Sequence, residues 1–388
     1  MMERRATALA AQMVQALRAR SGLVRDDVAA AFLSVPRHLF VPGVPLDEVY
    51  RFDAVIPTHF GADGLSTSSS SAPNIMATML EQLDVAPGMR VLEIGAGTGY
   101  NAALLAHLAG PDGAVLSIDL DAPIVAEARE HLARAAIANA RVECADGWLG
   151  AADDAPFDRI IATVGVYEIS PHWLAQLRPG GVLVAPLWLR AGAQVSVALV
   201  REGDELRSTS MCACGFMRLR GPHQGADAHV VVPGWRGRVD SPTARDWVAG
   251  FEGATPERLE LLRTLLRSPP TVTAVPRPPP GWTLRLALDE PDAIELTSRT
   301  GRRHHAMGVF SSTDPSVAVF EAGWIVAFGA PAGAERLRAA LARMRPLRIE
   351  DLDIRVVPHP ARATDDAWLL ERPHLDVVVR ERPVSTGP

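Results

Sequence analysis

The sequence predicts an α/β protein with a mostly parallel, doubly wound sheet, followed by a second, α+β domain. From about residue 90, short apolar runs alternate with helical patterns, which is typical of parallel sheets covered by helices. Glycines and acidic residues directly follow those apolar runs, at the strand ends where such sheets bind ligands. After about residue 225 the alternation fades into β-like runs. We therefore predict one domain over 1–225 and another over 226–388.

Two regions precede the sheet. Residues 5–20 suit a helix, and apolar residues at Val28, Phe32 and Val35 suit a second helix that stops before Pro36. A loop then leads to six consecutive hydroxyl residues, 66–71, which run into a helical pattern. We predict that Pro73 occupies the first turn of this helix and that Ser71 is its N-cap or near-cap residue.

The predicted sheet has a repeated unit of strand, turn and helix. The first unit has a glycine turn, the second an acidic turn, the third strand ends at Asp146 and Gly147, and the fourth is followed by a loop and a helix. The four units cover residues 89–110, 113–137, 140–150 and 156–177. A turn and two further strands follow at 178–201.

The C-terminal region begins with a proline-rich stretch, 268–282, which we expect to be an extended connector. It is followed by β-like runs and by one predicted helix at 333–344. The β-like runs cover 283–288, 316–329, 353–358 and 375–383. We expect these segments to form the α+β domain.

Composition narrows the classes of function. The 388 residues are 48% hydrophobic, enough for two cores, and the net charge of -6 argues against nucleic-acid binding. No apolar run approaches the roughly 18 residues that span a membrane, and the charged N-terminus is unlike a signal peptide. All 39 basic residues are arginine, which excludes lysine Schiff-base chemistry and a Walker-type phosphate loop.

The cysteines give no framework for disulfides or metal. There are three, Cys144, Cys212 and Cys214, so we expect a reducing, cytoplasmic setting. The C-x-C pair lacks a second pair of ligands at zinc-finger spacing, so we expect no metal site and read the two residues as part of a strand.

Glycines and acids point to a nucleotide-like cofactor. Gly95, Gly97 and Gly99 follow the first strand, where they allow a tight turn and close approach of a ligand. Glu93 lies just before them, where its carboxylate would face the pyrophosphate of a dinucleotide, and two negative charges there would repel each other. Asp119 ends the second strand, at a position suited to ribose hydroxyls.

This arrangement resembles the class I S-adenosylmethionine-dependent methyltransferases, which have a Rossmann-like fold. The resemblance implies S-adenosyl-L-methionine as cofactor and S-adenosyl-L-homocysteine as product. It places Glu93 beside the positively charged end of the cofactor, Asp119 at the ribose, and Asp146 with Gly147 at the adenine.

A more specific resemblance comes from motifs that occur in order over residues 10–220. The chain is similar to the protein-L-isoaspartate O-methyltransferase family, on the basis of "VPRHLFVP", "SAPNIMATML", "VLEIGAGTGYNAALLA", "ADGWLG", "APFDRIIATV" and "ISPHWLAQLRPGGVLVAPL". The resemblance implies that Ser71 faces the substrate carboxylate, with Ser69 and Ser70 sharing this work.

Other residues are candidates for substrate contacts. The loop 162–166 follows the fourth strand, so Thr163 and Val164 are expected to contribute backbone contacts. His59 and Asn74 flank the hydroxyl run, although a purely structural histidine is an alternative for His59. A carboxylate is already a nucleophile, so alignment and exclusion of water suffice for methyl transfer. The family's methyl ester is usually transient and closes to a succinimide.

Three features differ from the repair enzymes of that family. The segment before the hydroxyl run reads "HFGADGLSTSSSS", Asn74 stands near a position where the repair enzymes commonly have His or Gln-Pro-Tyr/His, and the chain continues well beyond residue 220. An elongated relative with a serine-rich loop, such as this chain, resembles the methyltransferases associated with ribosomally made peptides. This resemblance implies that the substrate is a macrocyclic precursor peptide, which is methylated on an aspartate and then forms an aspartimide. The arginines of "RLRG", "WRGR" and "RTGRRHH" then attract an acidic peptide, or simply form a solvated face.

Three other functions remain open. The protein is a housekeeping repair enzyme for isoaspartyl residues, a cofactor-binding scaffold without catalysis, or a small-molecule methyltransferase. The retained serine, glutamate and aspartates argue against the scaffold, and the S-A-P segment argues against small molecules.

Overall fold

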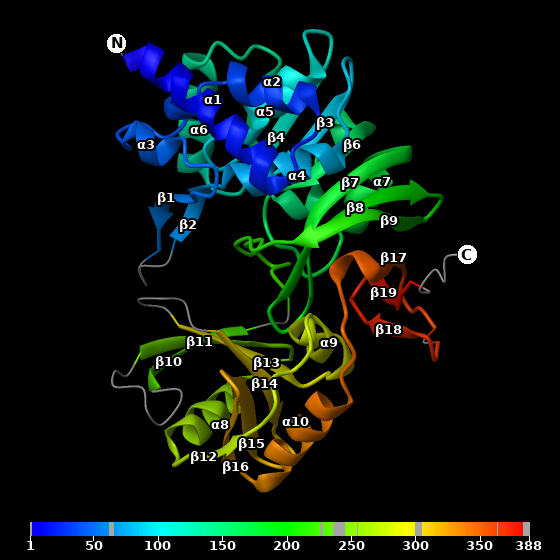
Figure 1. Cartoon of the computed structure of the whole chain (residues 1–388). Helices are drawn as coiled ribbons and strands as arrows, with labels where there is room; N and C mark the ends of the chain where they lie inside the picture. The colour runs from blue at the N-terminus through cyan, green and yellow to red at the C-terminus, as the bar shows by residue number, and fades with distance from the viewer. Residues whose placement is uncertain are drawn as a thin grey trace, which may run out of the picture.

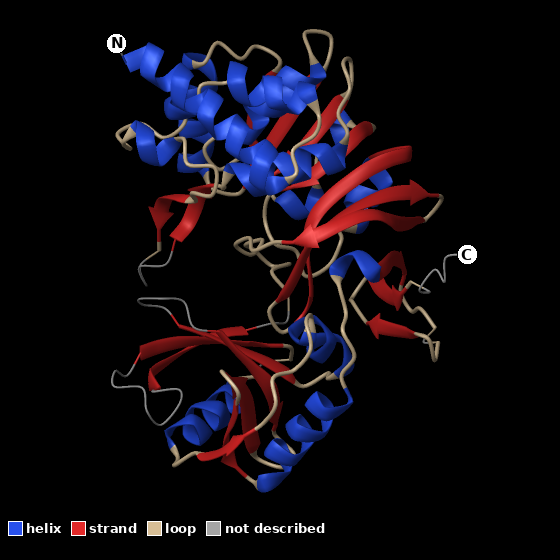
Figure 2. Ribbon diagram, in the orientation of Figure 1, coloured by secondary structure: helices blue, strands red, loops and turns tan. Residues whose placement is uncertain are grey.

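The computed structural model describes residues 2–61, 66–225, 228–235, 245–253, 255–298, 305–362 and 364–382. The chain forms two large sheets with helices and one two-stranded hairpin (Figures 1 and 2). Most of the arginine-rich segments "WRGR" and "RTGRRHH" lie outside the described residues.

The larger sheet has ten strands in the order β18-β19-β17-β9-β8-β7-β6-β3-β4-β5. Five neighbouring strands run parallel, as the alternation of strands and helices predicts. They are β3 (Arg90–Ile94), β4 (Ala114–Asp119), β5 (Ala140–Cys144), β6 (Phe157–Ala162) and β7 (Leu177–Arg190). Their C-terminal ends therefore meet at one edge of the sheet.

Both faces of this sheet are covered, because successive strand residues point to opposite sides. Val91 packs into a core with the N-terminal helices, whereas Leu92 packs into the core of the other face. The first core contains α1 (Met2–Ser21), α2 (Asp26–Ser34), α4 (Pro73–Leu83), α5 (Tyr100–Ala109) and α6 (Ala122–Arg134). The second contains α7 (Pro171–Gln176) and part of α9 (Trp282–Asp289). The doubly wound prediction is confirmed.

Short turns connect these elements. They are η1 (Arg37–Leu39), α3 (Leu46–Val49), η2 (Gly147–Leu149), η3 (Ala152–Asp154) and η4 (Ile349–Asp351). The predicted end of the second helix before Pro36 is confirmed, since α2 ends at Ser34.

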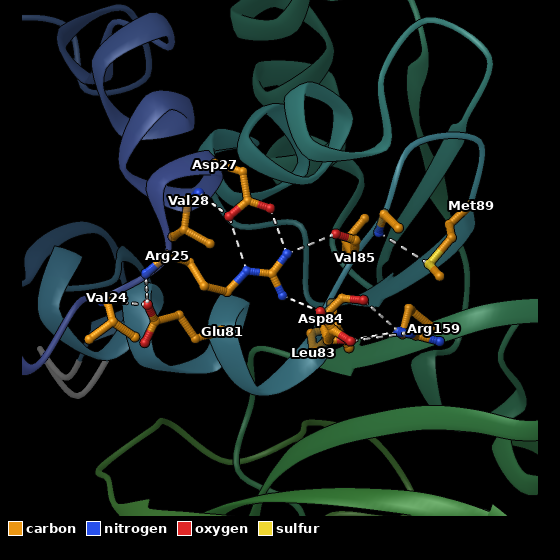
Figure 3. A network of polar contacts seen from close by, with 11 residues as sticks. Val24, Arg25, Asp27, Val28, Glu81, Leu83, Asp84, Val85, Met89 and Arg159 are labelled. Carbon is orange, nitrogen blue, oxygen red and sulfur yellow. Dashed lines mark hydrogen bonds and ion pairs between the residues drawn. The ribbon is translucent and has the colours of Figure 1, made fainter.

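An arginine network fixes α4 against α2 (Figure 3). The Arg25 guanidinium donates to Asp27, at 3.0 and 2.5 Å, and to Asp84, the C-cap residue of α4. Glu81 of α4 accepts the backbone N–H groups of Val24 and Arg25, both at 2.8 Å. These bonds hold the helix that follows the hydroxyl run.

The predicted domain boundary is wrong at the C-terminus. After β8 (Ala193–Glu202) and β9 (Glu205–Ala213), the larger sheet continues with β17 (Leu352–Pro358), β19 (Leu375–Glu381) and β18 (Ala367–Leu370). Val356 pairs with Leu206 across the junction. Residues 352–381 thus extend the first sheet, so that the second sheet is inserted between β9 and β17 (Figure 1). A strand's own sequence does not reveal which sheet it joins.

The inserted sheet has seven antiparallel strands in the order β10-β11-β13-β14-β15-β16-β12. They are β10 (Ala228–Trp235), β11 (Arg245–Phe251), β12 (Thr271–Ala274), β13 (Ala293–Ser298), β14 (His305–Ser311), β15 (Ser316–Glu321) and β16 (Trp324–Gly329). Helix α8 (Pro256–Arg267) shares a core with Phe310 and Val317, whereas α10 (Pro331–Arg343) shares one with Val309 and Ala318. The helices therefore cover opposite faces.

Two predictions for this region are wrong. Residues 283–288 form part of helix α9 rather than a strand, and the proline-rich connector contains edge strand β12. In α9, Leu284 and Leu288 enter the core of the first sheet, while Leu286 enters that of the inserted sheet. Burial on both sides removes the helical periodicity and leaves an alternation that looks like a strand. The predicted helix at 333–344 is confirmed as α10, but it is joined by α8 and α9.

Among the helices in the described part of the chain, none combines the length and the apolar character needed to cross a membrane.

Candidate active site

A cavity of about 380 Å³ lies at the C-terminal ends of β3, β4 and β6. This is where ligands bind in doubly wound sheets. Three further segments complete its walls: the hydroxyl run with the start of α4, the loop after β6, and residues 215–220.

The glycine loop forms the floor of the cavity. Gly95 has φ +98°, and an added Cβ would lie 2.8 Å from Thr163 Oγ1 and 2.9 Å from Val164 Cγ1. Gly97, with φ +50°, lies so close to the hydroxyl run that a Cβ would be 3.3 Å from the Ser69 carbonyl oxygen. Both positions therefore favour glycine for backbone conformation, and Gly95 also needs it for space.

Gly99 has a different role from the other two. It does not line the cavity, and its Cβ would lie 3.2 Å from the Ala128 carbonyl oxygen of α6. The residue allows the start of α5 to pack closely against α6, as the third glycine of such loops does.

Glu93 is a fully buried carboxylate on the cavity wall. It accepts hydrogen bonds from Asn101 Nδ2 at 2.7 Å and from Ser117 Oγ at 2.6 Å. Burial raises the pKa of Glu93 to about 7, and the two hydrogen bonds oppose this rise only partly. Within the described residues no arginine or histidine forms an ion pair with it. A cationic group of a ligand would supply the missing charge.

Asp119 ends β4 and also lines the cavity. Its Oδ2 accepts the N–H of Gly97 at 3.3 Å, and its Oδ1 accepts the N–H of Asp121 at 3.2 Å. These bonds hold the carboxylate at the mouth of the glycine loop, where an acid can accept ribose hydroxyls. Arg220 Nη2 lies 3.8 Å from Asp119 Oδ1.

Of the two residues predicted to contact adenine, one lines the cavity and the other does not. Gly147 lines the cavity, and a Cβ there would lie 2.7 Å from Ile94 Cγ2. Asp146 is not part of the lining, and its Oδ1 caps the turn η2 by accepting the N–H of Trp148 at 3.0 Å. Adenine recognition by Asp146 stays a prediction.

The hydroxyl run forms a strand, which corrects the prediction of a helix N-terminus. β2 (Ser66–Ser70) pairs antiparallel with β1 (Ile56–Phe60), with Ser70 opposite Ile56. Helix α4 begins at Pro73, as predicted, but its N-cap residue is Ala72, so Ser71 lies one residue before the cap, and no side-chain hydrogen bond caps the helix. The partner strand lies several residues upstream, so the local pattern could not reveal the pairing.

The strand places its hydroxyl residues in the cavity wall. All six residues from 66 to 71 line it, and Ser68 and Ser70 are almost fully buried. The run lies along the glycine loop, because a Cβ added to Gly97 would lie only 3.3 Å from the Ser69 carbonyl oxygen. The structure therefore brings Ser69, Ser70 and Ser71 together with the predicted cofactor residues.

The remaining substrate candidates separate into two groups. Thr163 and Val164 line the cavity, and Thr163 Oγ1 donates to the Gly95 carbonyl oxygen at 2.6 Å. His59 and Asn74 are not part of the lining. His59 Nε2 lies 3.1 Å from Glu127 of α6, which favours the structural alternative for this histidine.

Several residues of the cavity wall were not predicted from the sequence. Asn101 and Ser117 hold Glu93, and residues 215–220 close one side of the cavity. The latter segment is held by Gly165, whose N–H donates to Met217 O at 2.6 Å. Contacts between residues so distant in sequence leave no local pattern. Arg37, buried behind the hydroxyl run, belongs to the motif "VPRHLFVP" but was not recognised.

These residues fit S-adenosylmethionine. The glycine loop provides close backbone approach, Asp119 lies where an acid can accept ribose hydroxyls, and the buried Glu93 lacks the positive charge that the amino-acid end of this cofactor carries. Together with the parallel sheet, this defines a class I S-adenosylmethionine-dependent methyltransferase.

Comparison with known proteins identifies the branch of this class. Residues 8–223 match the family model described as Protein-L-isoaspartate(D-aspartate) O-methyltransferase (PCMT). The chain belongs to this family, and the sequence-based resemblance is confirmed.

Individual relatives agree. The chain is 38% identical over 182 residues to a protein-L-isoaspartate O-methyltransferase of Thermotoga maritima, spanning 47% of this chain and 56% of that relative. It is 35% identical over 211 residues to the protein of that name from Methanopyrus kandleri, spanning 54% of this chain and 90% of the relative.

A solved structure named protein-L-isoaspartate O-methyltransferase is also similar. It has a TM-score of 0.54 and 25% identity, and the match covers 91% of this chain and 97% of that one. The match extends far beyond residue 223, so a chain of comparable extent also carries this name.

Proposed function

We propose that the protein transfers a methyl group from S-adenosylmethionine to the side-chain carboxylate of an isoaspartyl or aspartyl residue in a peptide or protein. One observation carries this proposal: the hydroxyl run 66–71 and the glycine loop form adjacent walls of one cavity. Hydroxyl donors suit a carboxylate, and the glycine loop suits the methyl donor.

The chain's residues bind and orient the reactants rather than activate a nucleophile. In the described part of the chain, the cavity lining includes no histidine and no cysteine that could act as a base. An ionised carboxylate needs none, because its oxygen is already nucleophilic. When bound, the cofactor supplies an electrophilic methyl group on a sulfonium. Serine hydroxyls hold the carboxylate in line, and apolar residues such as Ile75, Met76 and Met79 limit access of water.

The fate of the ester follows from its chemistry. A methyl ester of an aspartyl or isoaspartyl side chain is attacked by the following backbone nitrogen, which expels methanol and closes a succinimide. We propose that this ring closure follows methyl transfer, whether or not the enzyme assists it.

The source of the substrate has two candidates. The relatives are named for isoaspartate, and an elongated chain occurs among them, which supports repair of isoaspartyl residues. Tailoring of a macrocyclic, ribosomally made peptide is the second candidate. It is supported by the unusual hydroxyl run and by the residues beyond 223, which lie outside the family match.

Mass spectrometry with two substrates tests both candidates. The full chain is incubated with S-adenosylmethionine and either a linear isoaspartyl peptide or a cyclised peptide containing a normal aspartate. We expect the isoaspartyl peptide to gain a methyl group and then to lose methanol. Reaction of the cyclised peptide alone would establish tailoring instead. If neither peptide is methylated, the proposed function is wrong.

A further inference from the structure

Arg37 lies fully buried behind the hydroxyl strand. Its Nη2 donates to the Ser71 carbonyl oxygen at 2.9 Å, to the Ala54 carbonyl oxygen at 3.2 Å, and to Ser70 Oγ at 3.4 Å. Ala54 precedes β1, whereas Ser70 and Ser71 end the hydroxyl run. One guanidinium therefore joins both ends of the β1–β2 hairpin at the point where it meets the cavity.

The positive charge of Arg37 has no counter-charge in the described part of the chain. Its Nε and Nη1 atoms are buried without hydrogen-bond partners, and the carbon of the guanidinium lies 5.7 Å from the centre of the Tyr100 ring. Burial lowers the pKa of Arg37 accordingly. A buried cation without an anion is costly, and an uncharged residue would fasten the hairpin at lower cost. An anionic ligand bound nearby would supply the missing counter-charge.

The contacts of Arg37 lead into the cavity. Arg37 itself does not line it, but Ser70, Ser71 and Tyr100 do. The charge therefore acts through the wall rather than by contact with a ligand.

The hydroxyl of Ser70 is held in a defined role. Its oxygen accepts from Arg37, so its one hydrogen is left to donate elsewhere. No described protein group accepts that hydrogen, and the residue faces the cavity. At 3.4 Å this bond is long, and Nη2 shares its two hydrogens with two carbonyl oxygens, so the contact orients the Ser70 hydroxyl rather than strengthening it. The geometry thus leaves an oriented donor for whatever occupies the substrate side of the cavity.

We propose that Arg37 is a positioning residue for recognition of the substrate carboxylate. It holds Ser70 as a donor and places an uncompensated positive charge behind the hydroxyl strand. The site consequently prefers an ionised carboxylate over the neutral carboxamide of the same shape. This inference rests on the proposed function.

The experiment uses the full chain and the variants R37Q, R37K, S70A and R37Q/S70A. Binding of an isoaspartyl peptide, and of the same peptide with a carboxamide in place of the carboxylate, is measured with saturating S-adenosylhomocysteine. The KM and kcat for methyl transfer and the affinity for S-adenosylhomocysteine alone are measured in parallel. R285Q serves as a control, because Arg285 is also buried but pairs with Glu381 away from the cavity.

We expect R37Q to weaken binding of the isoaspartyl peptide and raise its KM by about tenfold to a hundredfold, while the carboxamide peptide is little affected. The affinity for S-adenosylhomocysteine should change less than about twofold. R37K should keep much of the preference for the carboxylate, because it retains the charge. In the S70A background, R37Q should have a much smaller effect, because the two residues act together.

Three results would overturn the inference. These are equal weakening of both peptides, loss of cofactor affinity as large as loss of peptide affinity, or fully multiplicative effects of R37Q and S70A. If R37Q does not fold, the same comparisons on S70A decide, with unchanged carboxylate binding counting against the inference. A wild-type chain that neither binds nor methylates the isoaspartyl peptide would instead refute the proposed function, and with it this inference.

Discussion

Replacing Glu93 with glutamine isolates the effect of a buried charge on the cavity wall. The substitution keeps the shape of the side chain. Its oxygen can still accept from Asn101, and its amide can donate to the hydroxyl oxygen of Ser117. Only the charge is lost.

The magnitude follows from the pKa of Glu93. Burial raises this pKa from 4.5 to about 7, which corresponds to a penalty of about 3 kcal/mol on the ionised form. The folded chain therefore holds an extra proton between about pH 4.5 and 7, and its free energy of unfolding falls as pH rises through that window. E93Q should remove this part of the pH dependence. Above pH 7 it should raise the melting temperature of the ligand-free chain by on the order of 5 °C.

Cofactor binding should respond in the opposite direction. The ionised carboxylate attracts the ammonium group of S-adenosylhomocysteine, so the affinity of the wild-type chain should rise by roughly tenfold between pH 6 and pH 8. E93Q should bind at least about tenfold more weakly at pH 8 and show little change with pH. Calorimetric titration and thermal unfolding over this range measure both effects.

A control and two outcomes make the test decisive. E130Q removes an exposed carboxylate of α6 and should leave both profiles unchanged. The reasoning is refuted if E93Q shows the same stability profile as the wild-type chain. It is also refuted if E93Q binds S-adenosylhomocysteine as tightly as the wild-type chain at pH 8.

Two other substitutions test the framework of the site. G95A should weaken S-adenosylhomocysteine binding more than tenfold, because its Cβ would press on Thr163 and Val164 at positive φ. G88A is the control: Gly88 has φ +83° with open space around it, so this substitution should add only backbone strain, of about 1 kcal/mol, to the folded state. Calorimetry compares the two, and equal effects would contradict the steric argument. R372Q should lower stability by about 3 to 5 kcal/mol, because the almost fully buried Arg372 pairs with Glu252 at 3.1 Å and joins the inserted sheet to the first one. Denaturant unfolding measures this loss, and an unchanged midpoint would show that the pair is dispensable.

The sequence by itself determined the parallel part of the sheet and most of the candidate cofactor site. Alternating apolar runs and helical patterns are local, and the residues that follow each strand meet at one edge as a consequence of parallel pairing. Glu93, the glycine loop and Asp119 could therefore be placed together without coordinates, and the structure has them around one cavity. The order of motifs also identified the family.

Only the tertiary structure decided how distant segments complete the site. The hydroxyl run is a strand because Ile56 and its neighbours pair with it, and local sequence favoured a helix start. Strands β17 to β19 return to the first sheet after the inserted one, since hydrogen bonding to β9 depends on the path of the whole chain. Arg37 reaches Ser70 across 33 positions of sequence. Such contacts are set by packing between elements, which the periodicity of a single element does not encode.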